Sequence, residues 1–198
     1  MINSNFISYL LDCPSIYNFL IRCHHGKIVG VIKKEMLIKE GDWILDFGCG
    51  PGVNVRLFKN SFYAGVDKNI RYITYAKTKF PKRNFVVADI CQSFGIDAKF
   101  DWILGNCIFH NLSDEKMIYA LNGLKLLLKK SGKILIIDLL MPKQNNYLGR
   151  FMVSLDRGKY PRSATHYEGL FLQKFSITKK CILKIWWWDF CVFLMDFK

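Results

Sequence analysis

The chain has 198 residues, of which 51% are hydrophobic and 15% aromatic, and it carries a formal net charge of +13. This length is typical of one compact domain, and the hydrophobic content excludes a largely disordered chain. The excess of 29 basic over 16 acidic residues suggests an acidic partner, either nucleic acid, an anionic lipid or an acidic small molecule.

No segment of the sequence predicts export, membrane insertion or a metal site. Residues 1–11 lack the basic start and apolar run of a signal peptide, and the apolar stretches 134–141 and 190–195 are far shorter than the roughly 20 residues of a membrane span. The seven cysteines are odd in number and never in CxxC spacing, which argues against a disulfide framework or a zinc site. Cys23, His24 and His25 would point in different directions on a helix, so they predict no metal either. We expect a cytoplasmic protein with free thiols.

The predicted elements alternate between helices and apolar strands. Apolar residues at i, i+3, i+4 and i+7 predict a helix over 14–36. Strands are expected at 43–47, 62–66, 85–88, 101–104 and 133–140, and helices at 53–58, 69–80 and 113–130. Residues 143–175 are expected to be partly helical, and two final strands are expected within 176–197. Apolar strands that alternate with helices are typical of a parallel sheet covered on both faces, which binds ligands at the carboxyl ends of its strands.

The strongest functional signal directly follows the first strand. It is the run Asp-Phe-Gly-Cys-Gly-Pro-Gly at residues 46–52, in which the glycines allow a tight turn and the close approach of a ligand. Asp67 ends the second strand, where a carboxylate can accept hydrogen bonds from ribose hydroxyls. Asp89 ends the third strand and is placed to accept from an adenine amino group. The spacing therefore predicts a nucleoside-containing cofactor.

The loop distinguishes between two classes of cofactor. A dinucleotide fold uses GxGxxG, but Val53 stands at the third glycine position. Asp46 would also repel a pyrophosphate, whereas it suits a ligand with an ammonium and a sulfonium, so S-adenosylmethionine is favoured over NAD. Asp46 as a turn cap, and Asp67 or Asp89 as a solvated turn acid, are the structural alternatives. Acids at three successive strand ends favour the functional interpretation.

Residues 42–140 resemble the class I S-adenosylmethionine-dependent methyltransferases. The matching motifs are 46–52, 65–67, 88–90, 100–106 with 109–112 behind it, and 126–134. The resemblance implies an α/β fold with a Rossmann-like, doubly wound, seven-stranded, mostly parallel sheet and an antiparallel C-terminal strand. We expect one domain over 1–198, made of an N-terminal helical lid (1–41), a cofactor-binding core (42–141), a substrate-side insertion (142–175) and C-terminal strands (176–198).

The resemblance also implies the cofactor contacts. The glycine loop would hold the methionine portion, Asp67 the ribose and Asp89 the adenine, while Asn106 lies where the family contacts the methionine group or the substrate. The full predicted set is Asp46, Gly48, Cys49, Gly50, Asp67, Lys68, Asp89, Ile90 and Asn106.

Catalytic and substrate-binding residues are hypotheses with structural alternatives. His110 and Asp138, near strand ends, are candidate general bases, and each is otherwise a structural polar residue. Arg157, Tyr160 and Arg162 are hypothesised to contact the substrate, the two arginines through its carboxylate or phosphate; the alternative is a solvated basic loop. The run of three tryptophans at 186–188 is expected to pack a strand on both faces, with a substrate or partner surface as the alternative.

Three functions are compatible with these motifs. The first is methyl transfer to a small molecule, which can be anionic because the last 57 residues hold 10 basic and 4 acidic residues. The second is an RNA or protein methyltransferase, although Asn106 is not followed by the Pro-Pro-Tyr type of motif found in amino-directed nucleic-acid enzymes. The third is a non-catalytic partner subunit that binds the cofactor, against which the intact loop and its acids argue.

Overall fold

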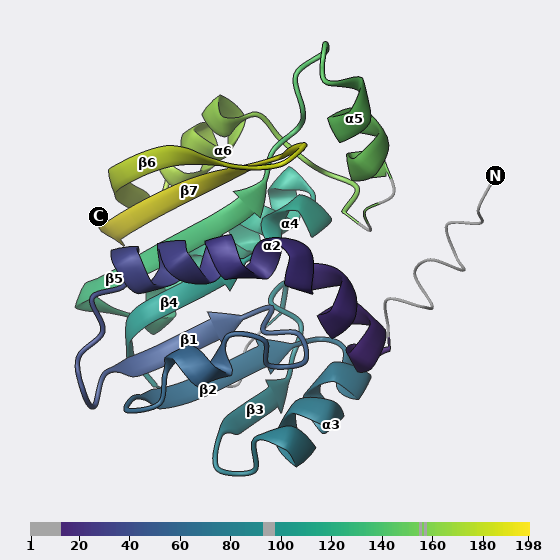
Figure 1. The fold of residues 1–198 in the computed structure, drawn as a ribbon. Helices are drawn as coiled ribbons and strands as arrows, with labels where there is room; N and C mark the ends of the chain where they lie inside the picture. Colours follow the sequence, from purple (N-terminus) through teal and green to yellow (C-terminus); the bar gives the residue numbers. More distant parts are fainter. Residues whose placement is uncertain (1–12, 93–97, 155, 157) are drawn as a thin grey trace.

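The computed structural model describes residues 13–92, 98–154, 156 and 158–198, with the side chains of 15–24 outside the described part. The predicted sheet is confirmed, with seven strands in the order β3-β2-β1-β4-β5-β7-β6 (Figure 1). Strand β7 is antiparallel to both of its neighbours, and the other adjacent pairs are parallel. The strands are β1 (Trp43–Phe47), β2 (Phe62–Asp67), β3 (Asn84–Val87), β4 (Phe100–Asn106), β5 (Leu128–Leu139), β6 (Phe175–Ile185) and β7 (Trp188–Phe197).

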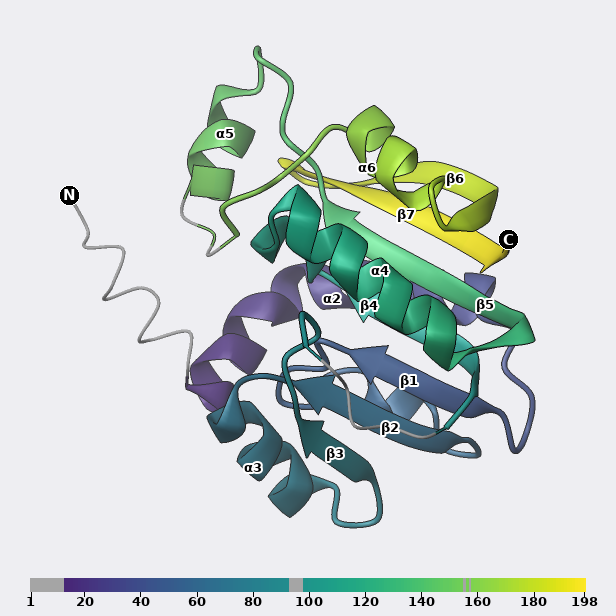
Figure 2. The ribbon, with the colours of Figure 1, turned by 180° about the vertical axis from the view of Figure 1, so that it is seen from behind.

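Helices cover both faces of this sheet. Figure 1 shows α2 (Pro14–Glu35) in front of the strands, and Figure 2, from behind, shows α4 (Asp114–Leu127) and α6 (Ala164–Phe171) on the opposite face. Helix α3 (Ile70–Lys79) packs beside β3, and α5 (Tyr147–Ser154) projects beyond the end of β5. Successive residues of β5 contribute to two separate cores, Ile134 and Ile136 to one and Leu135 and Ile137 to the other. Burial on both faces explains why the central strands are continuously apolar.

The strand order places the carboxyl ends of β1 and β4 at the centre of the molecule. Strand β1 pairs in parallel with β2 on one side and with β4 on the other, so the chain reverses its direction of winding between them. Crossover connections diverge at such a point and leave a crevice at the carboxyl ends of the two strands. The fold therefore directs the search for a site to the loops after β1 and β4.

Three sequence predictions differ from the structure. The C-terminal half of the predicted lid is part of the core, because Ile28, Ile32 and Met36 are at most 3% exposed and pack on the sheet. The predicted helix at 53–58 is only one 3₁₀ turn, η1 (Val55–Leu57). Helix α4, expected over 113–130, begins after Ser113, which accepts a hydrogen bond from the Lys116 amide. It ends at Leu127, because β5 already begins at residue 128.

The two final strands, expected within 176–197, form a hairpin, but the tryptophans do not all lie in its strands. Trp186 and Trp187 form the turn between β6 and β7, and only Trp188 belongs to a strand. Trp186 has a φ of 55° and is 61% exposed, so it does not pack a strand face as predicted. Among the described residues, no helix combines the length and the apolar character needed to cross a bilayer.

Candidate active site

The glycine loop after β1 is built on left-handed backbone. Gly48, Gly50 and Gly52 have φ values of 70°, 54° and 80°, a region that favours glycine. The loop folds back on β2, because the amides of Gly48 and Cys49 both donate to the carbonyl of Val66, at 2.7 and 3.0 Å. A Cβ atom on Gly48 would lie 2.7 Å from Cδ1 of Ile108, so the turn after β4 leaves room there only for glycine. The two loops at the centre of the sheet are thus closely fitted.

A cavity of about 390 Å³ lies at these loops, within the size range of small-molecule sites. The structure brings six of the nine predicted cofactor residues to its wall: Gly48, Gly50, Asp67, Lys68, Asp89 and Ile90. The other lining residues are Asn69, Tyr72, Ala88, Cys107, Ile108, Asn111, Leu112 and Lys159. Residues from the ends of β1, β2, β3 and β4 therefore meet around one space.

Backbone amides fix the two carboxylates of the cavity wall. Asp67 accepts from the amide of Gly50 at 2.9 Å and from the amide of Asn69 at 2.8 Å, which ties the end of β2 to the glycine loop. Asp89 accepts from the amide of Cys91 at 2.9 Å. Both carboxylates are thereby held at the ends of adjacent strands.

The other three predicted cofactor residues, Asp46, Cys49 and Asn106, are not part of the wall. Asp46 is fully buried, and its Oδ2 accepts from the hydroxyl of Tyr63 at 2.9 Å. Burial raises the pKa of Asp46 to about 7, although the Tyr63 hydrogen bond opposes that rise. Burial likewise raises the pKa of the Cys49 thiol, so it is not a reactive cysteine.

Buried acceptor atoms near the glycine loop lack hydrogen-bond partners. Within the described residues, these atoms are Oδ1 of Asp46, Oδ1 of Asn54 and Oδ1 of Asn106. Such atoms are rare in folded proteins and call for a ligand or a water molecule. Asp46 and Asn106 lie at the carboxyl ends of β1 and β4. Together with Asp67 and Asp89 at the wall, these acceptors fit a cationic, hydroxyl-bearing ligand.

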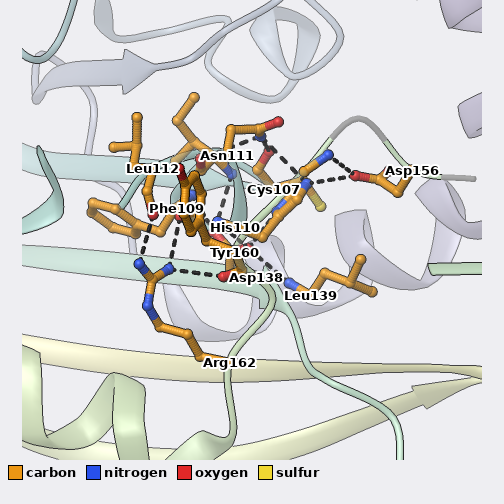
Figure 3. A network of polar contacts seen from close by, with 12 residues as sticks. Cys107, Phe109, His110, Asn111, Leu112, Asp138, Leu139, Asp156, Tyr160 and Arg162 are labelled. Carbon is orange, nitrogen blue, oxygen red and sulfur yellow. Dashed lines mark hydrogen bonds and ion pairs between the residues drawn. The ribbon is translucent and has the colours of Figure 1, made fainter. Parts of the chain in front are cut away.

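The two predicted general bases, His110 and Asp138, lie in contact with each other beneath the turn after β4 (Figure 3). Asp138 accepts from Nδ1 of His110 at 2.6 Å and from the amides of Ile108 and Phe109 at 3.1 and 2.6 Å. Nε2 of His110 lies 3.1 Å from Oδ1 of Asp156. Burial lowers the pKa of His110, but the two carboxylates outweigh it and raise the pKa to about 10. Neither residue lines the cavity, and both ring nitrogens face carboxylates, so the geometry makes the pair a support rather than a base.

Arg162, predicted to bind substrate, is committed to the protein instead. Its side chain is 4% exposed, and its guanidinium donates to the carbonyls of Phe109, Leu112 and Tyr160 at 3.1, 2.6 and 2.9 Å. It also pairs with Asp114 at 2.6 Å. A buried arginine with these partners has no donor directed at a substrate.

The rest of the predicted substrate segment lies closer to the cavity. Tyr160 is 44% exposed and its amide donates to the carbonyl of His110 at 2.9 Å, while Arg157 lies outside the described residues. Lys159 lines the cavity, although it is not among the predicted substrate residues. The one sequence feature that points to it is its position in the basic stretch before Arg162. The described residues contain no group of three His, Cys, Asp or Glu that could hold a metal ion, and the Cys23 and His24 side chains lie outside them.

Comparisons with known proteins point to the same chemistry. Residues 44–132 match a protein family described as a methyltransferase domain. A demethylmenaquinone methyltransferase from Thermotoga maritima is 27% identical over 111 residues, which cover 54% of this chain and 48% of that protein. A putative methyltransferase of Invertebrate iridescent virus 6 is 29% identical over 125 residues, which cover 56% of this chain and 47% of that protein. The chain therefore spans about half the length of the curated relatives it matches.

Solved structures share the whole architecture. A TehB-like S-adenosylmethionine-dependent methyltransferase from Corynebacterium glutamicum superposes with a TM-score of 0.66 at 20% identity, covering 86% of each chain. A geranyl diphosphate C-methyltransferase from Streptomyces coelicolor, solved with Mg²⁺, geranyl diphosphate and S-adenosyl-L-homocysteine, has a TM-score of 0.71 at 9% identity, covering 88% of this chain and 81% of that one. At these identities the likeness shows the fold.

Fold and cavity together define the class, an α/β protein with a Rossmann-like sheet and a cavity at its central carboxyl edge. The matched domain and the relatives make this more specific. Residues 44–132 are similar to a methyltransferase domain, and the Corynebacterium glutamicum neighbour is an S-adenosylmethionine-dependent methyltransferase.

Proposed function

We propose that this chain transfers a methyl group from S-adenosylmethionine to a small anionic molecule. The observation that carries the proposal is that the glycine loop, Asp67 and Asp89 border one cavity where the strand order reverses. When bound, the cofactor supplies a methyl group on a positively charged sulfur, which an acceptor atom displaces in line. The chain's main task is then to orient the two reactants.

Each part of the cavity suits one part of the cofactor. Gly48 and Gly50 allow the methionine portion to approach the backbone closely, because no Cβ stands in the way. Asp67 would accept from the ribose hydroxyls and Asp89 from the adenine amino group. The unpartnered oxygens of Asp46 and Asn106 add negative potential behind the loop, which favours a cationic ligand.

Two lysines support an anionic acceptor. Lys68 and Lys159 line the same cavity as the acids, and they come from different parts of the chain, the end of β2 and the segment after α5. A lysine ammonium is a flexible point charge that binds carboxylates and phosphates. The Streptomyces coelicolor neighbour was solved with geranyl diphosphate, a small anionic molecule, which supports an anionic acceptor.

The proposal assigns no proton transfer to His110 or Asp138. Their polar atoms face one another, backbone amides and Asp156, so these residues position the turn after β4. They are positioning residues, and rate acceleration comes from the orientation of the acceptor against the methyl group.

Calorimetry with S-adenosylhomocysteine tests the cofactor site. The wild type should bind, and Asp67→Asn should bind at least tenfold more weakly, while Glu40→Gln, at an exposed turn, should bind normally. Circular dichroism checks that each variant folds, because Asp67 also anchors the glycine loop. No heat with the folded wild type would refute the cofactor assignment.

A screen with labelled S-adenosylmethionine tests the acceptor class. Label should enter small carboxylates or phosphates rather than neutral analogues of the same skeleton. Lys159→Gln should raise the acceptor KM at least fivefold and leave the affinity for S-adenosylhomocysteine unchanged. Transfer to RNA or to protein but not to small molecules would overturn the proposal.

A further inference from the structure

One corner of the molecule exposes large apolar side chains in an unusual concentration. On α5, Tyr147 is 81% exposed, Phe151 58% and Leu148 54%, and Trp186 in the β6–β7 turn is 61% exposed. We refer to these four residues as the aromatic corner. Gly149 and Val153, on the other side of α5, are buried. The helix therefore packs on the protein through one face and presents its apolar residues to the outside.

The helix and the turn lie side by side. The side-chain amide of Asn146, directly before α5, donates to the carbonyl of Trp187 at 3.3 Å. The rings of Trp186 and Trp187 lie 5.5 Å apart, and both ribbon views place α5 next to the end of the hairpin (Figures 1 and 2). Two segments separated by about 40 residues thus form one projecting apolar surface.

Three of the four charged residues around this surface are basic, and the fourth is Asp189, opposite Lys184 in the hairpin. Residues 141–154 contain Lys143 and Arg150 and no acidic residue, and both side chains are exposed. Lys184, two residues before Trp186, is also exposed. Exposed aromatic and aliphatic side chains flanked by lysine and arginine are the composition of segments that lie in the headgroup region of an anionic bilayer.

We propose that the aromatic corner docks this protein on an anionic lipid surface. Trp and Tyr favour the boundary between headgroups and acyl chains, and each nearby Lys or Arg adds attraction to anionic lipid. The corner projects from the fold in Figure 1, a shape that can enter a soft, flat lipid surface. Lys143 and Lys184 also differ from the core of a protein interface, where lysine is depleted.

The docking surface adjoins the cavity along the chain. Helix α5 ends at Ser154, and the next described residues are Asp156, which contacts His110, and Lys159, which lines the cavity. Docking would therefore bring the cavity close to the bilayer, and the acceptor would be a membrane amphiphile with an anionic head. This consequence rests on the proposed function, whereas the docking does not.

Co-sedimentation with vesicles tests the docking directly. The full chain should sediment with vesicles of equal parts phosphatidylglycerol and phosphatidylcholine and not with phosphatidylcholine alone, and added salt should release it. The double variant Phe151→Ser with Trp186→Ser should bind at least tenfold more weakly. Leu126→Ser is the matched control, since Leu126 is 70% exposed and lies beside Lys125 and Lys130, and it should bind like the wild type.

The outcomes separate docking from catalysis. Tryptophan emission should shift to the blue on addition of the mixed vesicles, and Trp186→Ser should reduce the shift. Absence of sedimentation, or equal binding by the double variant, would overturn the docking proposal. So would a concentration-dependent dimer that the double variant abolishes, because the corner would then bind protein. Calorimetry with S-adenosylhomocysteine should be the same for all these variants, so a defect there reports on the proposed function instead.

Discussion

Replacing Arg162 distinguishes a structural arginine from a substrate-binding one. The guanidinium joins the turn after β4 to the segment after α5, through the carbonyls of Phe109, Leu112 and Tyr160. Arg162→Met keeps the length and apolar stem of the side chain and removes every donor. We expect a large loss of stability and no change in the affinity for S-adenosylhomocysteine.

The expected loss can be estimated from the partners. The bonds to Phe109 and Leu112 are buried, and each carbonyl left without a donor costs about 1–3 kcal/mol. The Asp114 carboxylate is 46% exposed, so losing that ion pair costs less than about 1 kcal/mol. Together these losses lower the free energy of unfolding by about 3–5 kcal/mol, the usual effect of removing one partner from a buried pair.

Urea unfolding followed by circular dichroism measures this difference. Arg162→Lys should lose about half as much free energy of unfolding as Arg162→Met. An ammonium keeps the charge, but it cannot donate at once to three carbonyls that surround a planar guanidinium. Asp114→Asn should lose less than about 1 kcal/mol. The reasoning is refuted if Arg162→Met unfolds at the wild-type midpoint while the acceptor KM rises, because the guanidinium would then contact the substrate.

Three further predictions concern the same region. His110→Gln should lower the free energy of unfolding by about 3–5 kcal/mol below pH 6.5 and by progressively less as the pH rises through about 10, because the pKa of His110 is raised to about 10. Parallel pH–stability profiles of the variant and the wild type would contradict this. Asp46→Asn should raise the free energy of unfolding by at most about 4 kcal/mol above pH 7 and leave it unchanged below pH 4, because the pKa of Asp46 is raised to about 7. The same variant should weaken S-adenosylhomocysteine binding in calorimetry. A pH–stability profile like that of the wild type would argue against this prediction. Gly48→Ala should lower the melting temperature and abolish that binding, because its Cβ would meet Ile108; normal binding argues against it.

The strands and the cavity acids could be predicted because each leaves a local mark in the sequence. Strands buried on both faces must be almost continuously apolar, and a loop with positive φ must be rich in glycine. Asp67 is the last residue of β2 and Asp89 lies two residues after β3, so the parallel topology brings them to one edge without further information. These features depend on near neighbours in the chain or on the topology alone.

The roles of the basic residues could not be predicted in the same way. Arg162 and Lys159 are three positions apart in one basic segment, yet one is buried against three carbonyls and the other lines the cavity. The path of the segment decides between these roles, and contacts with residues about 50 positions earlier determine that path. Sequence spacing within the segment carries no information about such contacts.

The buried charges of this protein serve position more than stability. A buried ion pair gains little over apolar packing, because desolvation offsets most of the Coulomb attraction. Here, however, Asp138 at the end of β5 contacts the turn after β4, and His110 of that turn contacts Asp156 in the segment after α5. Arg162 joins this turn and this segment a second time. The same two segments carry Ile108 and Lys159 to the wall of one cavity. Weakening the network should therefore raise the acceptor KM before it affects cofactor binding, since the glycine loop and Asp67 are held by separate backbone hydrogen bonds.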